Sequence, residues 1–172
     1  MDPHLPEGGS LLDLGCGWQA ALLRHAAPRI RAGFGLDPKA EPADLPANVR
    51  VVHHRRVAVP WPLPEPQVDA VSMLAVLEHL DQEVADAVLA EVRRVLRSDG
   101  RLVLTVPTPS AKPVLEFLAF RMGVVNPDEI RDHKIYYDRR RLEASLARHG
   151  FAIERYRTFQ LGWNSLCVAR PA

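Results

Sequence analysis

The fold of this chain is decided by the stretch Leu11-Leu12-Asp13-Leu14-Gly15-Cys16-Gly17. Its first four residues form a short apolar run that is typical of a buried strand, and the glycines after it indicate a tight turn. Residues 19–26 then have the composition of a short helix, which Pro28 ends. The free N–H groups of such a helix point back at the turn. The stretch therefore predicts a ligand site at the carboxyl end of a strand.

Strands and helices alternate outward from this stretch. A helix with apolar residues at helical spacing is expected over 81–97, ended by Ser98-Asp99-Gly100. Further strands are expected over 30–36, 49–53, 68–74 and 101–106. Prolines at every second position in 60–66 exclude a regular helix and indicate an extended loop. The alternation predicts a parallel sheet with right-handed crossovers.

The pattern changes after Pro107. Two helices, over 112–122 and 139–149, are followed by two strands, over 151–159 and 164–169, with a turn near Gly162. Two strands joined by a short turn pair in opposite directions, so the sheet is expected to end in an antiparallel hairpin.

Composition limits the class of protein. The chain has 172 residues, of which 47% are hydrophobic and 25% charged, and its formal net charge is +1. These values predict one packed domain over 1–172 and argue against a dedicated nucleic-acid binder, which carries a basic surplus. No apolar run is long enough for a membrane helix, and residues 1–10 lack the features of a leader. Cys16 and Cys167 lie far apart, so a reduced, cytoplasmic protein is expected.

Two carboxylates beside the glycine turn indicate which nucleoside binds there. Asp37 ends the second strand, where an acid can accept hydrogen bonds from both ribose hydroxyls. Gly15-Cys16-Gly17-Trp18-Gln19-Ala20 also satisfies the relaxed dinucleotide pattern, so the turn alone fits NAD as well. Asp13 distinguishes NAD from S-adenosylmethionine. Its negative charge would repel the diphosphate of NAD and attract the amino group of S-adenosylmethionine.

These residues resemble the motifs of class I S-adenosylmethionine-dependent methyltransferases of the type 11 group. The resemblance rests on residues 12–17, 35–37, 69–80 and 91–104, taken in order. It implies a Rossmann-like α/β fold, with a mostly parallel seven-stranded sheet in the order 3-2-1-4-5-7-6 and a C-terminal antiparallel hairpin. It also implies a set of cofactor contacts: Asp13, Gly15, Cys16, Gly17, Asp37, Pro38, Leu74 and Ala75.

Within the cofactor motifs, the chain departs from the family pattern at two places. Gln19 replaces the third glycine of the first motif, so the turn is expected to be less open there. The acid that follows the third strand in relatives, and holds the adenine amine, has no counterpart in residues 53–57. Adenine is then expected to be held by backbone groups, or more weakly.

Candidate catalytic residues lie near the expected acceptor pocket, residues 108–137. His133 is the first candidate for a general base and His79 the second, since a neutral imidazole suits proton removal near pH 7. Some relatives bind a divalent metal through a second acid three residues before a Glu-His pair. Here Ala75 occupies that position before Glu78-His79, so no metal is expected.

The predicted function is methyl transfer from S-adenosylmethionine to a small-molecule or glycan-type acceptor. Residues 73–76 lack the signature of nucleic-acid amino methyltransferases, and neither nucleic acid nor a membrane is an expected partner. Two alternatives stay open. One is a non-catalytic module that keeps the fold but has lost or weakened cofactor binding. The other, less favoured, is an NAD-dependent oxidoreductase, for which the chain lacks a Tyr-x-x-x-Lys pair.

Overall fold

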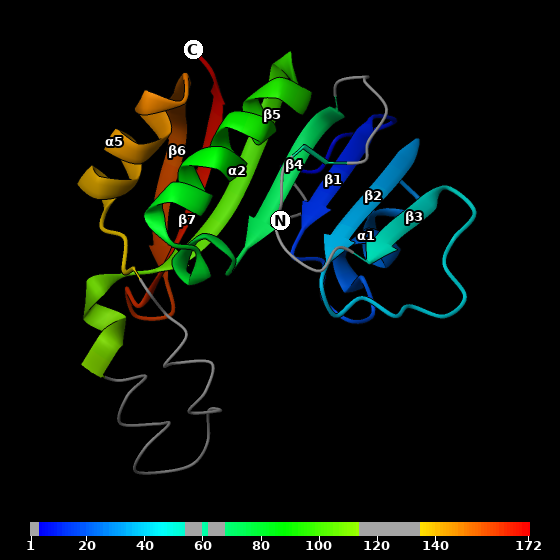
Figure 1. Ribbon diagram of the computed structural model, residues 1–172, viewed down its shortest axis with the longest axis horizontal. Helices are drawn as coiled ribbons and strands as arrows, with labels where there is room; N and C mark the ends of the chain where they lie inside the picture. The colour runs from blue at the N-terminus through cyan, green and yellow to red at the C-terminus, as the bar shows by residue number, and fades with distance from the viewer. Residues whose placement is uncertain (1–3, 54–59, 62–67, 114–134) are drawn as a thin grey trace.

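The computed structural model describes residues 4–53, 60–61, 68–113 and 135–172 (Figure 1). They form one seven-stranded sheet in the order β3-β2-β1-β4-β5-β7-β6. The strands are β1 (Ser10–Leu14), β2 (Ala32–Asp37), β3 (Val49–His53), β4 (Val68–Leu74), β5 (Leu96–Pro107), β6 (Phe151–Phe159) and β7 (Asn164–Pro171). The first five pair in parallel, and β7 pairs antiparallel with both β5 and β6. The predicted fold class and strand order are confirmed.

Helices cover both faces of the sheet (Figure 1). Neighbouring residues of a strand point to opposite faces, and in β1 Leu11 packs in one apolar core and Leu12 in another. The core of Leu11 contains the buried residues of α1 (Ala21–Ala26). The core of Leu12 contains the apolar faces of α2 (Gln82–Val95) and α5 (Arg139–Arg148). Within the described ranges, no helix is long and apolar enough to span a bilayer.

The start of β5 differs from the sequence prediction. The helix expected over 81–97 ends at Val95, and β5 begins at Leu96, so Ser98-Asp99-Gly100 lie inside a strand. Leu96 is buried and pairs with Val68 of β4, after which the register shifts. Burial and pairing with a distant strand outweigh the local turn signal.

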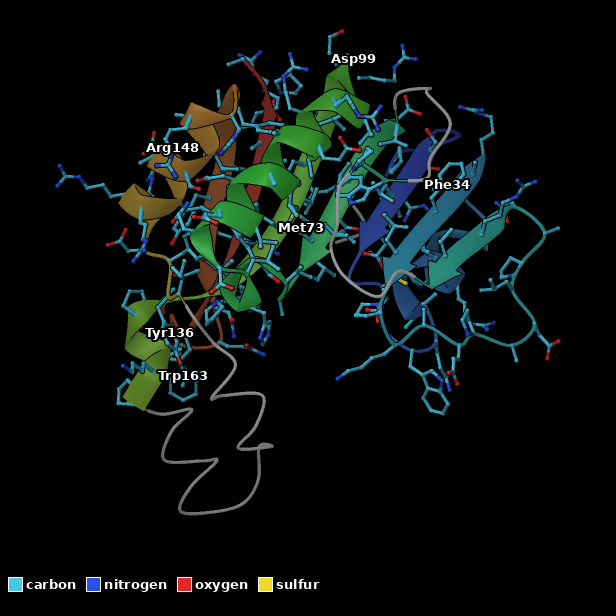
Figure 2. All side chains as sticks on the ribbon, in the orientation of Figure 1. Phe34, Met73, Asp99, Tyr136, Arg148 and Trp163 are labelled. Atoms are coloured by element: carbon cyan, nitrogen blue, oxygen red, sulfur yellow. The ribbon has the colours of Figure 1, made fainter. Side chains whose placement is uncertain are left out.

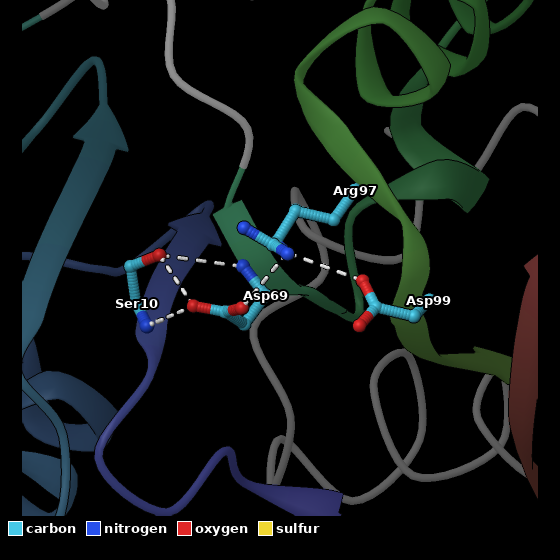
Figure 3. A network of polar contacts seen from close by, with 4 residues as sticks. All are labelled: Ser10, Asp69, Arg97 and Asp99. Atoms are coloured by element: carbon cyan, nitrogen blue, oxygen red, sulfur yellow. Dashed lines mark hydrogen bonds and ion pairs between the residues drawn. The ribbon is translucent and has the colours of Figure 1, made fainter.

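A polar network holds this irregular strand end against its neighbours (Figure 3). The guanidinium of Arg97 lies 3.3 Å from the Asp69 carboxylate and 3.1 Å from that of Asp99. Ser10 of β1 donates to Asp69 from its backbone N, at 2.7 Å, and from its hydroxyl, at 2.9 Å. The network therefore ties together the amino ends of β1, β4 and β5, at the edge of the sheet opposite the glycine turn.

The region after β5 is described only in part. A short 3-10 helix, η3 (Pro109–Ala111), follows the strand, and only residues 112 and 113 of the helix expected over 112–122 are described. Helix α5 begins after Asp138, whose carboxylate accepts a hydrogen bond from the backbone N of Arg141 at 2.7 Å. Asp138 is therefore an N-cap, and the arginines after it form the first turn of the helix.

Candidate functional site

The carboxyl ends of β1, β2 and β4 meet at one edge of the sheet. The central strand β1 lies between the other two, with Asp13 paired to Gly35 on one side and to Ser72 on the other. The chain leaves β1 toward β2 and β3, while β4 and β5 extend the sheet the other way. Parallel sheets bind ligands where the strand order reverses in this manner. The site predicted from the glycine turn lies at this position.

The glycine turn is packed on one side and open on the other. Gly15 adopts φ +74°, donates its N–H to Leu36 O at 2.8 Å, and lies so close to Val76 that a Cβ would overlap with the Val76 side chain. Gly17 adopts φ +71°, and a Cβ there would meet no atom within 4 Å. The open side leaves room for a ligand to approach the backbone at Gly17.

Cys16 is a packing residue of this turn. It is buried, and its Sγ would lie 2.9 Å from a Cβ on Gly35, so the two residues fit only because one is a glycine. Burial raises the pKa of the Cys16 thiol to about 12, and the carboxylates of Asp13 and Asp37 add to this shift. The thiol is therefore protonated at neutral pH and unsuited to act as a nucleophile.

Asp37 joins the turn after β1 to the end of β2. One oxygen of its carboxylate accepts a hydrogen bond from the backbone N of Gly17 at 2.9 Å, and the other accepts from the N of Lys39 at 2.7 Å. Each carboxylate oxygen has a second lone pair that can accept another hydrogen bond. Asp37 can thus hold the turn and accept from a ribose hydroxyl together. Pro38, next to it, is exposed.

Asp13 is a buried carboxylate at the end of β1. It is 3% exposed, and the Ser72 hydroxyl donates a hydrogen bond to it at 2.6 Å. Burial raises the pKa of Asp13 to about 6, against the Ser72 hydrogen bond, and the charge of Asp37 raises it further. No cationic side chain within the described ranges forms an ion pair with it. Burial makes the charged form of this carboxylate costly, and a nearby cation would lower that cost, so the site favours a ligand with an ammonium group.

The end of β4 forms the third side of the site. Leu74 is half-buried and Ala75 is exposed. Ala75 adopts the left-handed conformation, φ +55°, which costs a residue with a Cβ roughly 1–2 kcal/mol. Backbone strain of this kind persists only where the surrounding structure holds it, and it is found often at functional sites.

Of the two candidate bases, only His79 lies among the described residues. His79 is half-buried in the 3-10 helix η2 (Leu77–His79), directly after this strand end. His133 lies outside the described residues, as do Phe117 and Phe120, two aromatic residues of the expected acceptor pocket. Tyr137, expected in the acceptor pocket, instead packs in the core at 1% exposure. In Figure 2 its neighbour Tyr136, like Trp163, is seen toward the end of the sheet opposite Asp99.

Glu78 is a residue that sequence reasoning considered only as half of a metal site. It is 1% exposed, and its Oε2 accepts no hydrogen bond from the described part of the chain. Burial raises its pKa to about 7. Nothing in the local sequence indicates this burial, since η2 contacts the distant strand β5 and the Glu78 carbonyl accepts from the N of Ile135. Among the described residues, no three His, Cys, Asp or Glu side chains gather as a metal site would require.

Comparison with known proteins agrees with this geometry. Residues 2–156 match the model of a family described as a methyltransferase domain. A stretch of 105 residues is 30% identical to cyclopropane mycolic acid synthase 1 of Mycobacterium tuberculosis. That stretch covers 58% of this chain and 37% of the synthase, so the chain spans well under half the length of the curated relatives it matches.

Two solved structures show the same fold. An S-adenosylmethionine-dependent methyltransferase from Mesorhizobium loti superposes with a TM-score of 0.74 at 19% identity, over 98% of this chain and 94% of that one. The O-methyltransferase NcsB1 of neocarzinostatin biosynthesis, solved with S-adenosylmethionine and 2-hydroxy-5-methyl naphthoic acid, gives 0.67 at 17% identity. The superposition covers 96% of this chain and 49% of NcsB1.

The buried carboxylate makes a prediction about stability. The pKa of Asp13 is raised from 3.8 to about 6 on folding, so between these values the folded state binds more protons than the unfolded state. Stability attributable to Asp13 therefore falls as pH rises through this window and stays low above it. Asp13→Asn keeps the Ser72 hydrogen bond without the charge. We expect it to raise the free energy of unfolding at pH 7.5 by roughly 1–3 kcal/mol.

Urea unfolding of both proteins between pH 4 and 8 measures this effect. The difference in the free energy of unfolding between Asp13→Asn and the unchanged protein should shrink toward zero near pH 4. A variant that is less stable than the unchanged protein at pH 7.5 would show that the Asp13 charge has a partner that stabilises it.

Proposed function

The chain belongs to the class I family of S-adenosylmethionine-dependent methyltransferases, and on that premise we propose that it transfers a methyl group from this cofactor to a small-molecule or glycan-type acceptor. The observation that carries the proposal is the buried Asp13 carboxylate beside the open side of the glycine turn at Gly17. The pair combines a buried acid, which has no ion-pair partner in the described ranges, with space for a ligand.

The residues at this edge fit S-adenosylmethionine and fit NAD poorly. Asp13 suits the amino group of the methionine part, and Asp37 suits the ribose hydroxyls. A diphosphate in the same place would lie against two carboxylates, since Asp13 and Asp37 are close enough to raise the pKa of Asp13. The two carboxylates thus favour a cofactor that is cationic and lacks phosphate.

When bound, S-adenosylmethionine supplies a methyl group that its sulfonium charge already activates. The chain's task is then to align the acceptor and to exclude water. The glycine turn and the end of β4 can bind the cofactor, while residues 108–113 and 135–137 approach the same edge from β5. Ile135 N donates to Glu78 O at 3.2 Å, and Tyr137 N donates to Pro107 O at 3.4 Å. These bonds fasten the returning segment beside the end of β4.

A hydroxyl or protonated amine acceptor must also lose a proton. We propose His133 for this step, with His79 as the second candidate. His79 lies in the short helix that follows the end of β4, close in sequence to the strained Ala75.

The acceptor class is inferred from charge and sequence. A net charge of +1 gives no general attraction for nucleic acids, and Met73-Leu74-Ala75-Val76 lacks the signature of enzymes that methylate base amines. A small molecule or a glycan needs neither feature. NcsB1, which shares the fold, was solved with a small aromatic acid.

Ligand binding and activity test the proposal in two steps. Calorimetric titration with S-adenosylhomocysteine should give saturable binding, and NAD should give none. Labelled S-adenosylmethionine, incubated with pooled metabolites and oligosaccharides, should then transfer label to at least one pool. If neither S-adenosylhomocysteine nor S-adenosylmethionine binds at millimolar concentration, the proposal is contradicted and a non-catalytic module is favoured.

Asp37→Ala should weaken S-adenosylhomocysteine binding by about 1.5–3 kcal/mol, the scale for a hydrogen bond to a charged group. The variant loses a ribose acceptor and releases the backbone N of Gly17. Glu41→Ala, an exposed acid in the same segment, is the matched control and should bind normally. Unchanged affinity in a folded Asp37→Ala variant would assign Asp37 to the turn alone.

His133→Asn should lower turnover by about 10²–10⁴-fold with S-adenosylhomocysteine affinity nearly unchanged, if the acceptor is a hydroxyl. The pH–rate profile should also lose its acidic limb, because the group that must be deprotonated is gone. A decrease of less than about fivefold would exclude His133 as the base and assign that role to His79 or to alignment alone.

Methyl transfer should not depend on a divalent metal. Ala75 stands where metal-binding relatives have a second acid, and one Glu with one His is a poor site for magnesium. Activity should therefore survive dialysis against a chelator. A large loss that added magnesium restores would overturn this prediction.

A further inference from the structure

Ala75 is held in its left-handed conformation by a residue of the neighbouring strand. Its backbone N–H lies 3.2 Å from the carbonyl oxygen of Thr105 and 3.1 Å from the Thr105 hydroxyl oxygen, so both oxygens accept from it. Thr105 is in β5, paired with Leu74 in the parallel register. Ala75 is exposed, and φ +55° is uncommon and unfavourable for a residue with a Cβ, so the two bonds to Thr105 help to hold it.

The turn at Ala75 sets the position of the next side chain. Val76 leaves the strand direction, with φ −120° and ψ −45°, and its Cγ2 comes to rest against Gly15. A Cβ on Gly15 would overlap with this methyl group, which means that the glycine turn and Val76 are in close contact. Gly15 lies two residues before Gly17, where the glycine turn is open.

A continuous set of contacts therefore runs from β5 to the cofactor turn. It starts at the Thr105 hydroxyl, passes through the backbone of Ala75 and the side chain of Val76, and ends at Gly15. The hydroxyl is the part of this set that a substitution can remove, since the bond from the Ala75 N–H to the Thr105 carbonyl belongs to the backbone.

We propose that Thr105 is a positioning residue that fixes the glycine turn for the cofactor through the left-handed Ala75 and the contact of Val76 with Gly15. Its hydroxyl acts through the backbone of Ala75. It selects the backbone conformation that presses Val76 against the turn. The link to cofactor affinity rests on the proposed function, whereas the mechanical link between β5 and the turn does not.

Hydrogen exchange in the protein without ligand tests the mechanical link. Thr105→Val keeps the β-branched shape and removes the hydroxyl. Exchange should become faster at residues 74–78 and also at residues 14–18, which are far away in the sequence. Thr158→Val, the same change at an exposed position of β6, is the control and should alter neither segment. Faster exchange at 74–78 alone, or at neither segment, would overturn the proposal.

Binding of S-adenosylhomocysteine tests the consequence for the site. Thr105→Val should raise the dissociation constant about three- to tenfold, the scale of one neutral hydrogen bond. Thr105→Ser keeps the hydroxyl and should bind as the unchanged protein does. In the background of Ala75→Gly, where the left-handed conformation has no steric cost, Thr105→Val should change the dissociation constant less than about twofold.

The results separate this inference from the proposed function. An unchanged protein that fails to bind S-adenosylhomocysteine contradicts the proposed function, and the exchange measurement still decides whether Thr105 fixes the turn. A Thr105→Val effect that is equally large with and without the Ala75→Gly substitution would show that the hydroxyl acts by another route, and would overturn the inference.

Discussion

The site depends on a carboxylate that folding removes from water and that forms no ion pair with a cationic side chain of the described residues. Asp13 can be buried at the end of β1 because β4 places Ser72 directly beside it, and a hydroxyl donor lowers the cost of burial. Burial still raises its pKa to about 6, which means that the charged carboxylate is destabilised at this position. The neighbouring Asp37 charge destabilises it further, and a cationic group of a ligand would stabilise it.

The rest of the edge is arranged around this charge. Gly15 and Gly17 take conformations that suit residues without a Cβ, and Asp37 holds the N–H of Gly17 so that the turn keeps its shape with no ligand present. Val76 supports the turn from the side of β4. The surrounding strands are buried on both faces, so the site stands on a rigid part of the molecule. Such a site needs little rearrangement when a ligand binds.

Much of this could be predicted from the sequence, because the signals are local. The glycine turn, the acid at the end of β2 and the rhythm of strands and helices are short-range patterns. The motifs between residues 12 and 104, with the C-terminal strand pair, led to the correct strand order. Features that arise from contacts between distant segments were not predicted. Ser98-Asp99-Gly100 is a turn signal, yet Leu96 pairs with Val68 and begins a strand before it. The left-handed Ala75 is bonded to Thr105, and Asp37 accepts from the N–H of Gly17, so both depend on partners remote in sequence. The buried Glu78 lies in η2, which contacts the distant strand β5.

The most direct test of this account is the number of protons released when S-adenosylhomocysteine binds. It is measured by calorimetry at pH 6 in buffers of different ionisation enthalpy. An ammonium group beside Asp13 would favour the charged carboxylate, so about half a proton should be released at pH 6, and almost none at pH 8. Asp13→Asn should remove the release at pH 6. Binding without proton release at pH 6, or equal release from Asp13→Asn, would contradict the claim that this buried carboxylate receives the cofactor's amino group.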